Sequence, residues 1–218
     1  MENIFEAVKN NALFKHINQE DFDKTLCCLS AKSAFYNKND IIIHAGETPR
    51  FIGMVIYGKL RIIKEDMEGK QIILGDVSPP ELFGEVYAWS GLSGCPATIQ
   101  AATDCEVLLI DYKKIIQACS SACSAHRHLI QNMLQIMSAK IEMLDYKVEI
   151  LSKRTIRERL FCFLNSRSNG DKKFTIPFNR EEMAQFICVD RSAMSNELSK
   201  MREEGLIDFN RNEFELMY

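Results

Sequence analysis

The sequence predicts an α+β fold in three parts, an N-terminal antiparallel β-roll of jelly-roll type, a long central helix and a C-terminal winged helix-turn-helix. Short apolar runs separated by turn residues over residues 40–110 indicate the roll. A heptad repeat of apolar residues over 130–151 indicates the long helix, and two short amphipathic segments within 179–206 indicate the helix-turn-helix. The expected divisions are 1–122, 123–152 and 153–218.

Composition limits the classes of protein to which the chain can belong. Its 218 residues are 46% hydrophobic, which is enough for two modest cores. The opening MENIFEAVKN lacks an apolar signal segment, and the uncharged stretch 86–103 is too rich in Ser, Gly, Pro, Thr and Gln for a membrane helix. The eight cysteines therefore indicate reduced thiols. We expect a soluble, cytoplasmic protein with no membrane contact.

The first part is expected to begin with helices over residues 1–30, anchored by apolar residues such as Phe5 and Phe22, which suggest no chemistry. The pattern then changes to short β-type runs with glycines between or beside them. The expected strands are 41–43, 51–57, 60–63, 72–74, 98–102 and 107–110. Short strands at this spacing predict an antiparallel barrel or roll.

The central helix, expected from about residue 123 to 152, carries an apolar seam whose members are spaced alternately by four and three residues. The seam residues are Ile130, Leu134, Met137, Ile141, Leu144, Val148 and Leu151. If Leu134, Ile141 and Val148 are a positions, then Met137, Leu144 and Leu151 are d positions. β-Branched residues at a with Leu at d favour a parallel two-stranded coiled coil, and two of the three a positions fit this rule, so we expect a homodimer. The alternative is a single amphipathic helix lying on its own roll, which usually has a broader apolar stripe.

The third part is expected to begin with a helix over 156–164 and a polar loop over 165–171. Asn179 and Glu182 then form a capping-box pattern for the first helix of the helix-turn-helix, and Asp190 can cap the second. The apolar face of the first helix consists of Met183, Phe186 and Ile187. That of the second consists of Met194, Leu198 and Met201. Gly205 ends the second helix, and alternating segments on either side of 210–212 predict a β-hairpin wing.

The outer face of the second helix carries side chains that suit DNA bases. Arg191, Ser192, Ser195 and Asn196 lie within its first two turns, the part that enters a major groove in this geometry. The alternative is a helical hairpin packed on another protein.

Net charge does not by itself indicate a nucleic-acid partner. The chain has a net charge of −3, and residues 153–218 hold 12 Lys and Arg against 11 Asp and Glu, so any DNA-binding footprint must be local. The basic residues that can supply it are Arg180, Arg191, Lys200 and Arg202, with Lys153, Arg154, Arg157 and Arg159 upstream. A solvated charged face is the alternative for several of them.

This order of parts resembles the Crp/Fnr family of bacterial transcription regulators over nearly the whole chain. The most specific similarity lies in residues 179–207, above all in Val189-Asp190-Arg191-Ser192-Ala193-Met194-Ser195. Phe83-Gly84-Glu85 is similar to the glycine-glutamate turn that opens the family's effector-binding cassette. The resemblance implies a homodimer that binds a near-palindromic site in double-stranded DNA. It also implies RNA polymerase as a protein partner, and an effector in the roll that repositions the dimer helix and both recognition helices.

Departures from the family pattern concern the effector. The candidate effector-binding residues are Gly84, Glu85, Cys95 and Thr98. In members that bind cyclic nucleotides, an Arg followed by Ser or Thr stands where this chain has Cys95-Pro96. A buried phosphate without that Arg would lose a charge-assisted contact, on the order of several kcal/mol, which argues against cyclic AMP. Near the N-terminus only Cys27-Cys28 is present, which argues against the family's iron–sulfur cluster. The small-molecule effector is not identified.

Cys119, Cys123 and His126 form a second candidate site. Thiolates and an imidazole at such spacing can bind zinc or haem iron, although they supply only three ligands, and packing cysteines beside a surface histidine are the alternative. They support a competing function, a thiol- or metal-based redox sensor in which DNA binding is secondary. The sequence lacks Walker and Rossmann glycine loops, a nucleophile elbow and an HExxH motif, so we expect no enzyme activity and no catalytic residues.

Overall fold

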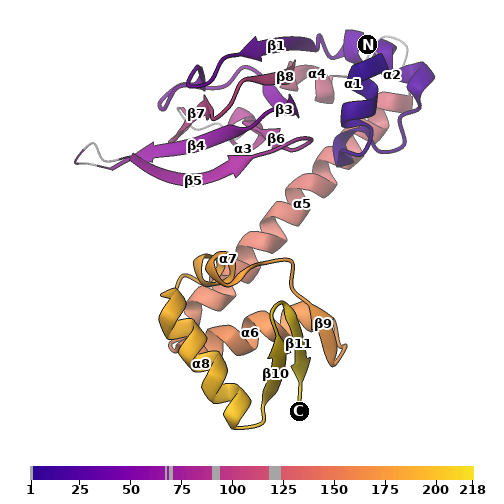
Figure 1. The fold of residues 1–218 in the computed structure, drawn as a ribbon. Coiled ribbons are helices and arrows are strands. Elements are labelled where there is room, and N and C mark those ends of the chain that lie inside the picture. Colours follow the sequence, from indigo (N-terminus) through magenta and orange to yellow (C-terminus); the bar gives the residue numbers. More distant parts are fainter. Residues whose placement is uncertain (1, 67, 69–70, 90–93, 118–123) are drawn as a thin grey trace. The chain divides into compact units, whose positions relative to one another are not determined.

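The computed structural model describes residues 2–66, 68, 71–89, 94–117 and 124–218, and confirms the predicted fold class (Figure 1). The chain divides into two compact units, Met1–Met137 and Ser138–Tyr218. The division falls inside the long helix α5 (Ser124–Ser152), which contributes side chains to both cores.

The first unit begins with three short helical segments, α1 (Glu2–Val8), η1 (Ala12–Phe14) and α2 (Gln19–Cys28). Phe14 and Phe22 meet edge to face, with ring centroids 5.1 Å apart, in a core that also includes Leu129 and Met133 of α5. The Asn132 side chain, which is buried in α5, donates hydrogen bonds to the carbonyl oxygens of Leu13 at 2.9 Å and Lys15 at 2.8 Å. This amide therefore holds the N-terminal segment on the long helix.

The β-roll consists of two four-stranded sheets, ordered β1-β8-β3-β6 and β2-β7-β4-β5. The strands are β1 (Lys32–Tyr36), β2 (Ile41–Ile43), β3 (Ile52–Tyr57), β4 (Leu60–Glu65), β5 (Gln71–Val77), β6 (Leu82–Phe83), β7 (Thr98–Ala101) and β8 (Cys105–Ile110). Two short helices, α3 (Glu85–Trp89) and α4 (Tyr112–Ile116), accompany them. All neighbouring strands pair antiparallel, as predicted.

Two of these strands were not expected from the sequence. β1 alternates weakly because Phe35 faces solvent with 77% exposure, and β6 is only two residues long. Neither segment carries the apolar run by which a strand is detected.

The second unit contains α6 (Ile156–Ser168), α7 (Arg180–Phe186) and α8 (Arg191–Glu203), with a sheet ordered β10-β11-β9. Its strands are β9 (Lys173–Thr175), β10 (Ile207–Asn210) and β11 (Glu213–Leu216). The expected polar loop over 165–171 was partly wrong, because α6 continues to Ser168 and stops at Asn169, where φ is +48°. β9, a third strand added to the predicted wing hairpin, was not expected.

Within the described residues, no helix combines the length and the apolar character that a membrane span requires.

Candidate nucleic-acid interface and effector site

The helix-turn-helix is built by side-chain caps at both of its helices. Asn179 accepts a hydrogen bond from the Glu182 backbone N–H at 2.9 Å, and Glu182 accepts one from the Asn179 N–H at 2.8 Å. Asp190 accepts from the Ala193 N–H at 2.8 Å. Each cap satisfies N–H groups that the first helical turn cannot pair, so the predicted starts of both helices are confirmed.

The turn between the helices is held from α6. Cys188 adopts a left-handed conformation with φ of +54°. The Arg159 guanidinium donates to the carbonyl oxygens of Ile187 at 3.3 Å and Cys188 at 3.1 Å. Arg159, one of the basic residues considered for DNA contact, is thus engaged in fixing the turn.

α8 presents one buried and one open face. Met194, Leu198 and Met201 are almost completely buried, whereas Arg191, Ser192 and Asn196 are exposed and Ser195 is half-buried. Ser195 donates to the Arg191 carbonyl at 2.9 Å and Ser192 donates to Asp190, so both hydroxyl oxygens can still accept a bond from a base. The predicted readout residues therefore share the first two turns of an open helix face.

A cavity of about 430 Å³ adjoins the start of this face and is lined by Asn179, Arg180, Glu181, Arg191, Arg211 and Asn212. The Arg191 Nε lies 3.8 Å from a Glu181 carboxylate oxygen. Arg211 is exposed in the turn of the wing, where its φ is +52°. Arg211 was not among the candidate residues predicted from the sequence, although its place in a predicted hairpin turn was a usable signal.

Arg180 and Lys200 have different environments. The Arg180 guanidinium carbon lies 4.8 and 4.9 Å from the ring centroids of Phe209 and Phe214, and burial lowers the pKa of this group. Arg180 therefore joins α7 to the wing as a cation stacked on aromatic rings. Lys200 is exposed in the last turn of α8.

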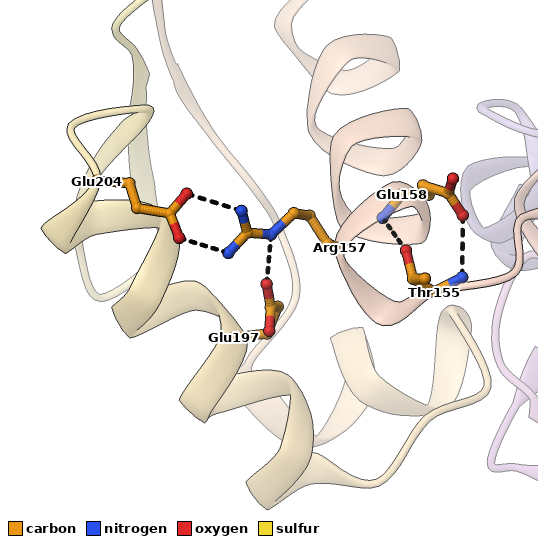
Figure 2. A network of polar contacts seen from close by, with 5 residues as sticks. All are labelled: Thr155, Arg157, Glu158, Glu197 and Glu204. Carbon is orange, nitrogen blue, oxygen red and sulfur yellow. Dashed lines mark hydrogen bonds and ion pairs between the residues drawn. The ribbon is translucent and has the colours of Figure 1, made fainter.

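Arg157 is also engaged within the unit (Figure 2). Its guanidinium donates to both oxygens of Glu204 at 2.7 Å and to Glu197 at 2.5 Å. Glu197 and Glu204 belong to α8 and its C-cap, so this arginine links the start of α6 to α8.

The predicted dimer seam is largely open to solvent in the single chain. Its exposed members are Leu134, Ile141, Leu144, Val148 and Leu151. Ile130 and Met137 are half-buried, and Met137 packs against the core of the first unit. Tyr146 and Ile150, which lie outside the seam, contribute to the core of the second unit.

The candidate effector residues lie in two environments. Gly84 has φ of +80°, which favours glycine, and leads into α3, where Glu85 is 2% exposed. Cys95 is 1% exposed, whereas Thr98 lies on the face of β7 opposite buried Ile99 and Ala101. The Thr98 hydroxyl accepts from the Ala45 N–H at 3.2 Å. Glu85 and Cys95 are thus interior groups, and Thr98 is not.

Burial determines the reactivity expected of the Cys95 thiol. Burial raises its pKa, so at pH 8 it holds less thiolate than an exposed cysteine. We expect iodoacetamide to modify exposed Cys27, Cys28 and Cys188 at least about tenfold faster than Cys95 in the native protein. Peptide mass spectrometry over a time course measures the ratio. Comparable rates in the native protein would contradict it, and unfolded protein is the control in which all four rates converge.

Cys119 and Cys123 of the second candidate site lie outside the described residues. The packing alternative was wrong in expecting a surface histidine, because His126 is buried and its Nε2 lies 3.1 Å from the Lys114 carbonyl oxygen. Among the residues that are described, no three or more His, Cys, Asp or Glu gather as metal ligands would. The redox sensor stays a prediction.

Two family models match the chain, a cyclic nucleotide-binding domain over residues 34–122 and a Crp-like helix-turn-helix domain over 158–217. The cAMP-activated global transcriptional regulator CRP of Salmonella typhimurium is 22% identical over 178 residues, covering 79% of this chain and 83% of that protein. The transcriptional activator protein FnrA of Stutzerimonas stutzeri is 24% identical over 213 residues, covering 92% and 82%.

Solved structures share the fold. The Thermus thermophilus catabolite activator protein has a TM-score of 0.56 at 22% identity, with 94% of this chain and 93% of that chain covered. CprK in complex with OCPA has a TM-score of 0.63 at 14% identity, with 92% of each chain covered. Both the order of the domains and the fold agree with these proteins.

Proposed function

We propose, from the premise that the chain belongs to the Crp/Fnr family of DNA-binding transcription regulators, that it acts as a homodimer on a near-palindromic DNA site. The observation that carries the proposal is the open face of α8, where Arg191, Ser192, Ser195 and Asn196 lie opposite a buried apolar face. An arginine can bond guanine bidentately, asparagine can bond adenine, and serine can bond either partner type.

Contacts with the DNA backbone would come from Lys200 and from Arg211. Lys200 extends from the last turn of α8, and Arg211 extends from the wing turn beside the cavity next to Arg191. Arg180 has a smaller part in this proposal than the sequence suggested, because its guanidinium is already stacked on Phe209 and Phe214. Phosphate contacts of this kind set affinity and register, whereas base contacts set specificity.

The exposed seam of α5 supports the homodimer. Large apolar side chains rarely stand exposed along one helix stripe unless a partner covers them. A second copy can cover this stripe with its own, since the heptad pattern suits a parallel two-stranded coiled coil. Two recognition helices related by a two-fold axis would then read half-sites about one helical turn apart.

The effector is proposed to be something other than cyclic AMP. Buried Cys95 stands where the resemblance places the phosphate-binding arginine, and a thiol with a raised pKa cannot neutralise a phosphate. Denaturing purified protein and analysing the supernatant by mass spectrometry tests for a retained small molecule. Saturable cyclic AMP binding in calorimetry would reject this part of the proposal. RNA polymerase as a partner stays a prediction.

Substitutions in α8 test the assignment of readout residues. We expect Arg191→Ala to cost about 1–3 kcal/mol in binding to a selected site and to relax preference at one base position. Lys200→Ala should weaken binding to selected and random DNA alike. It should also reduce the slope of log affinity against log salt concentration by about one released ion. DNA fragments selected from a random pool by the wild-type protein, followed by titration of each variant, provide the measurement. If both variants lost affinity equally on selected and random DNA, the assignment would be wrong, and a wild-type protein that enriched no sequence would refute the function itself.

A further inference from the structure

Arg157 belongs to α6 but makes its hydrogen bonds to α8, and its position in α6 does not itself favour a cation. Thr155 caps α6 and closes a capping box with Glu158, so Arg157 occupies the second helical position (Figure 2). A cation there faces the positive end of the helix dipole, which is locally unfavourable. Its hydrogen bonds instead go to two carboxylates of another helix.

Those two carboxylates flank Lys200. Glu197 precedes Lys200 by three residues and Glu204 follows it by four, and both spacings bring side chains together on a helix surface. Hydrogen bonds from Arg157 are the main cause that lowers the pKa of the Glu204 carboxyl, and the charge of Lys200 lowers it further. Among the described residues, ion pairs to Glu197 and Glu204 come from Arg157 and none comes from Lys200.

We infer that Arg157 is a positioning residue for DNA binding, which occupies the carboxylates of Glu197 and Glu204 and so leaves the Lys200 ammonium available to a DNA phosphate. The bidentate geometry suits this task, because a guanidinium engages both oxygens of Glu204 and still reaches Glu197 through its Nε. Without Arg157, two carboxylates would compete with the phosphate for one lysine. The inference rests on the proposed DNA-binding function.

The test compares the full-length chain with R157Q, K200Q, R157Q/K200Q and R157Q/E197Q/E204Q on selected and random DNA over a range of salt. R157Q, like K200Q, is expected to lower the affinity for both DNAs about tenfold. It should also reduce the slope of log affinity against log salt concentration by about one released ion. In the K200Q background, R157Q should change affinity less than about twofold, because the lysine on which it acts is absent. Replacing both carboxylates in R157Q/E197Q/E204Q should restore affinity to within about threefold of wild type.

A matched control is R61Q, which removes an exposed arginine paired with Asp76 at 3.0 Å in the β-roll, and it should leave DNA affinity unchanged. E197Q/E204Q, which keeps Arg157, covers the case in which R157Q does not fold. That variant is expected to bind DNA with wild-type or higher affinity. If the ion pairs served only to hold α8 in place, the variant would instead bind DNA more weakly.

Additive losses in R157Q/K200Q, or no restoration in R157Q/E197Q/E204Q, would overturn the inference while leaving DNA binding by the wild type intact. A wild type that enriched no DNA would instead reject the proposed function.

Discussion

Leu144→Glu is expected to convert the protein to a monomer and to lower its affinity for a selected DNA site by about 10²–10⁴-fold. Leu144 is 63% exposed in the single chain, so the substitution leaves the intrachain cores intact. In a dimer the same side chain would be at a d position of the coiled coil, where two opposed carboxylates would be desolvated and repel each other. A monomer would also lose the gain in affinity that comes from linking two half-site contacts. Analytical ultracentrifugation and DNA titration measure the two effects.

Met143→Glu is the matched control, because Met143 is the neighbouring residue, is 57% exposed and lies off the seam. It should remain dimeric and bind DNA like the wild type. A dimeric Leu144→Glu protein would disprove the assignment of the seam. Equal dissociation of both variants would show that the interface includes a different face of α5.

Phe163→Ala is expected to lower the free energy of unfolding of the second unit by about 3–5 kcal/mol. Phe163 is completely buried, and its ring centroid lies 5.4 Å from that of Phe186 and 6.3 Å from that of Phe178. The Arg167 guanidinium carbon lies 5.6 Å from the same ring. Truncation would therefore remove a large apolar contact area and leave a cavity among side chains that α6 and α7 hold in place.

Hydrogen exchange of peptides from α6 and α8 measures this loss without assuming that both units unfold together. The control is Phe161→Ala, since Phe161 is half-buried and contacts Tyr218 edge to face at 5.8 Å. It should cost about 1–2 kcal/mol. Similar exchange rates in the two variants would mean that the aromatic cluster is not the centre of the second core.

Local signals in the sequence predicted the helix-turn-helix to within a residue, because its caps lie next to the groups that they satisfy. Asn179, Glu182 and Asp190 act over three residues or fewer, so a linear pattern contains the whole interaction. β9 was missed because three residues with one half-buried phenylalanine show no periodicity, and it is a strand only through its pairing with β11.

The roles of charged residues were harder to predict. Arg157 and Arg180 were considered for DNA contact, yet the first pairs with Glu197 and Glu204 and the second stacks on Phe209 and Phe214. These partners are remote in sequence, and counting charges does not reveal which ones fold together. Spacing along the chain from Gly84 likewise placed Thr98 and Cys95 in one candidate effector site. Cys95 is buried, whereas Thr98 lies on the face of β7 opposite buried Ile99 and Ala101.

Because α5 contributes side chains to the cores of both units, the position of a cut within it determines which core stays intact. Tyr146 and Ile150 belong to the core of the second unit, and the Tyr146 hydroxyl donates to the Phe163 carbonyl at 3.3 Å. A DNA-reading fragment that starts after Ser152 would expose this core, whereas a fragment starting at Ser138 keeps it whole. Chimeric regulators built from this chain should therefore be joined near residue 138, between the parts of α5 that serve the two cores, in heptad register, rather than at the end of the helix.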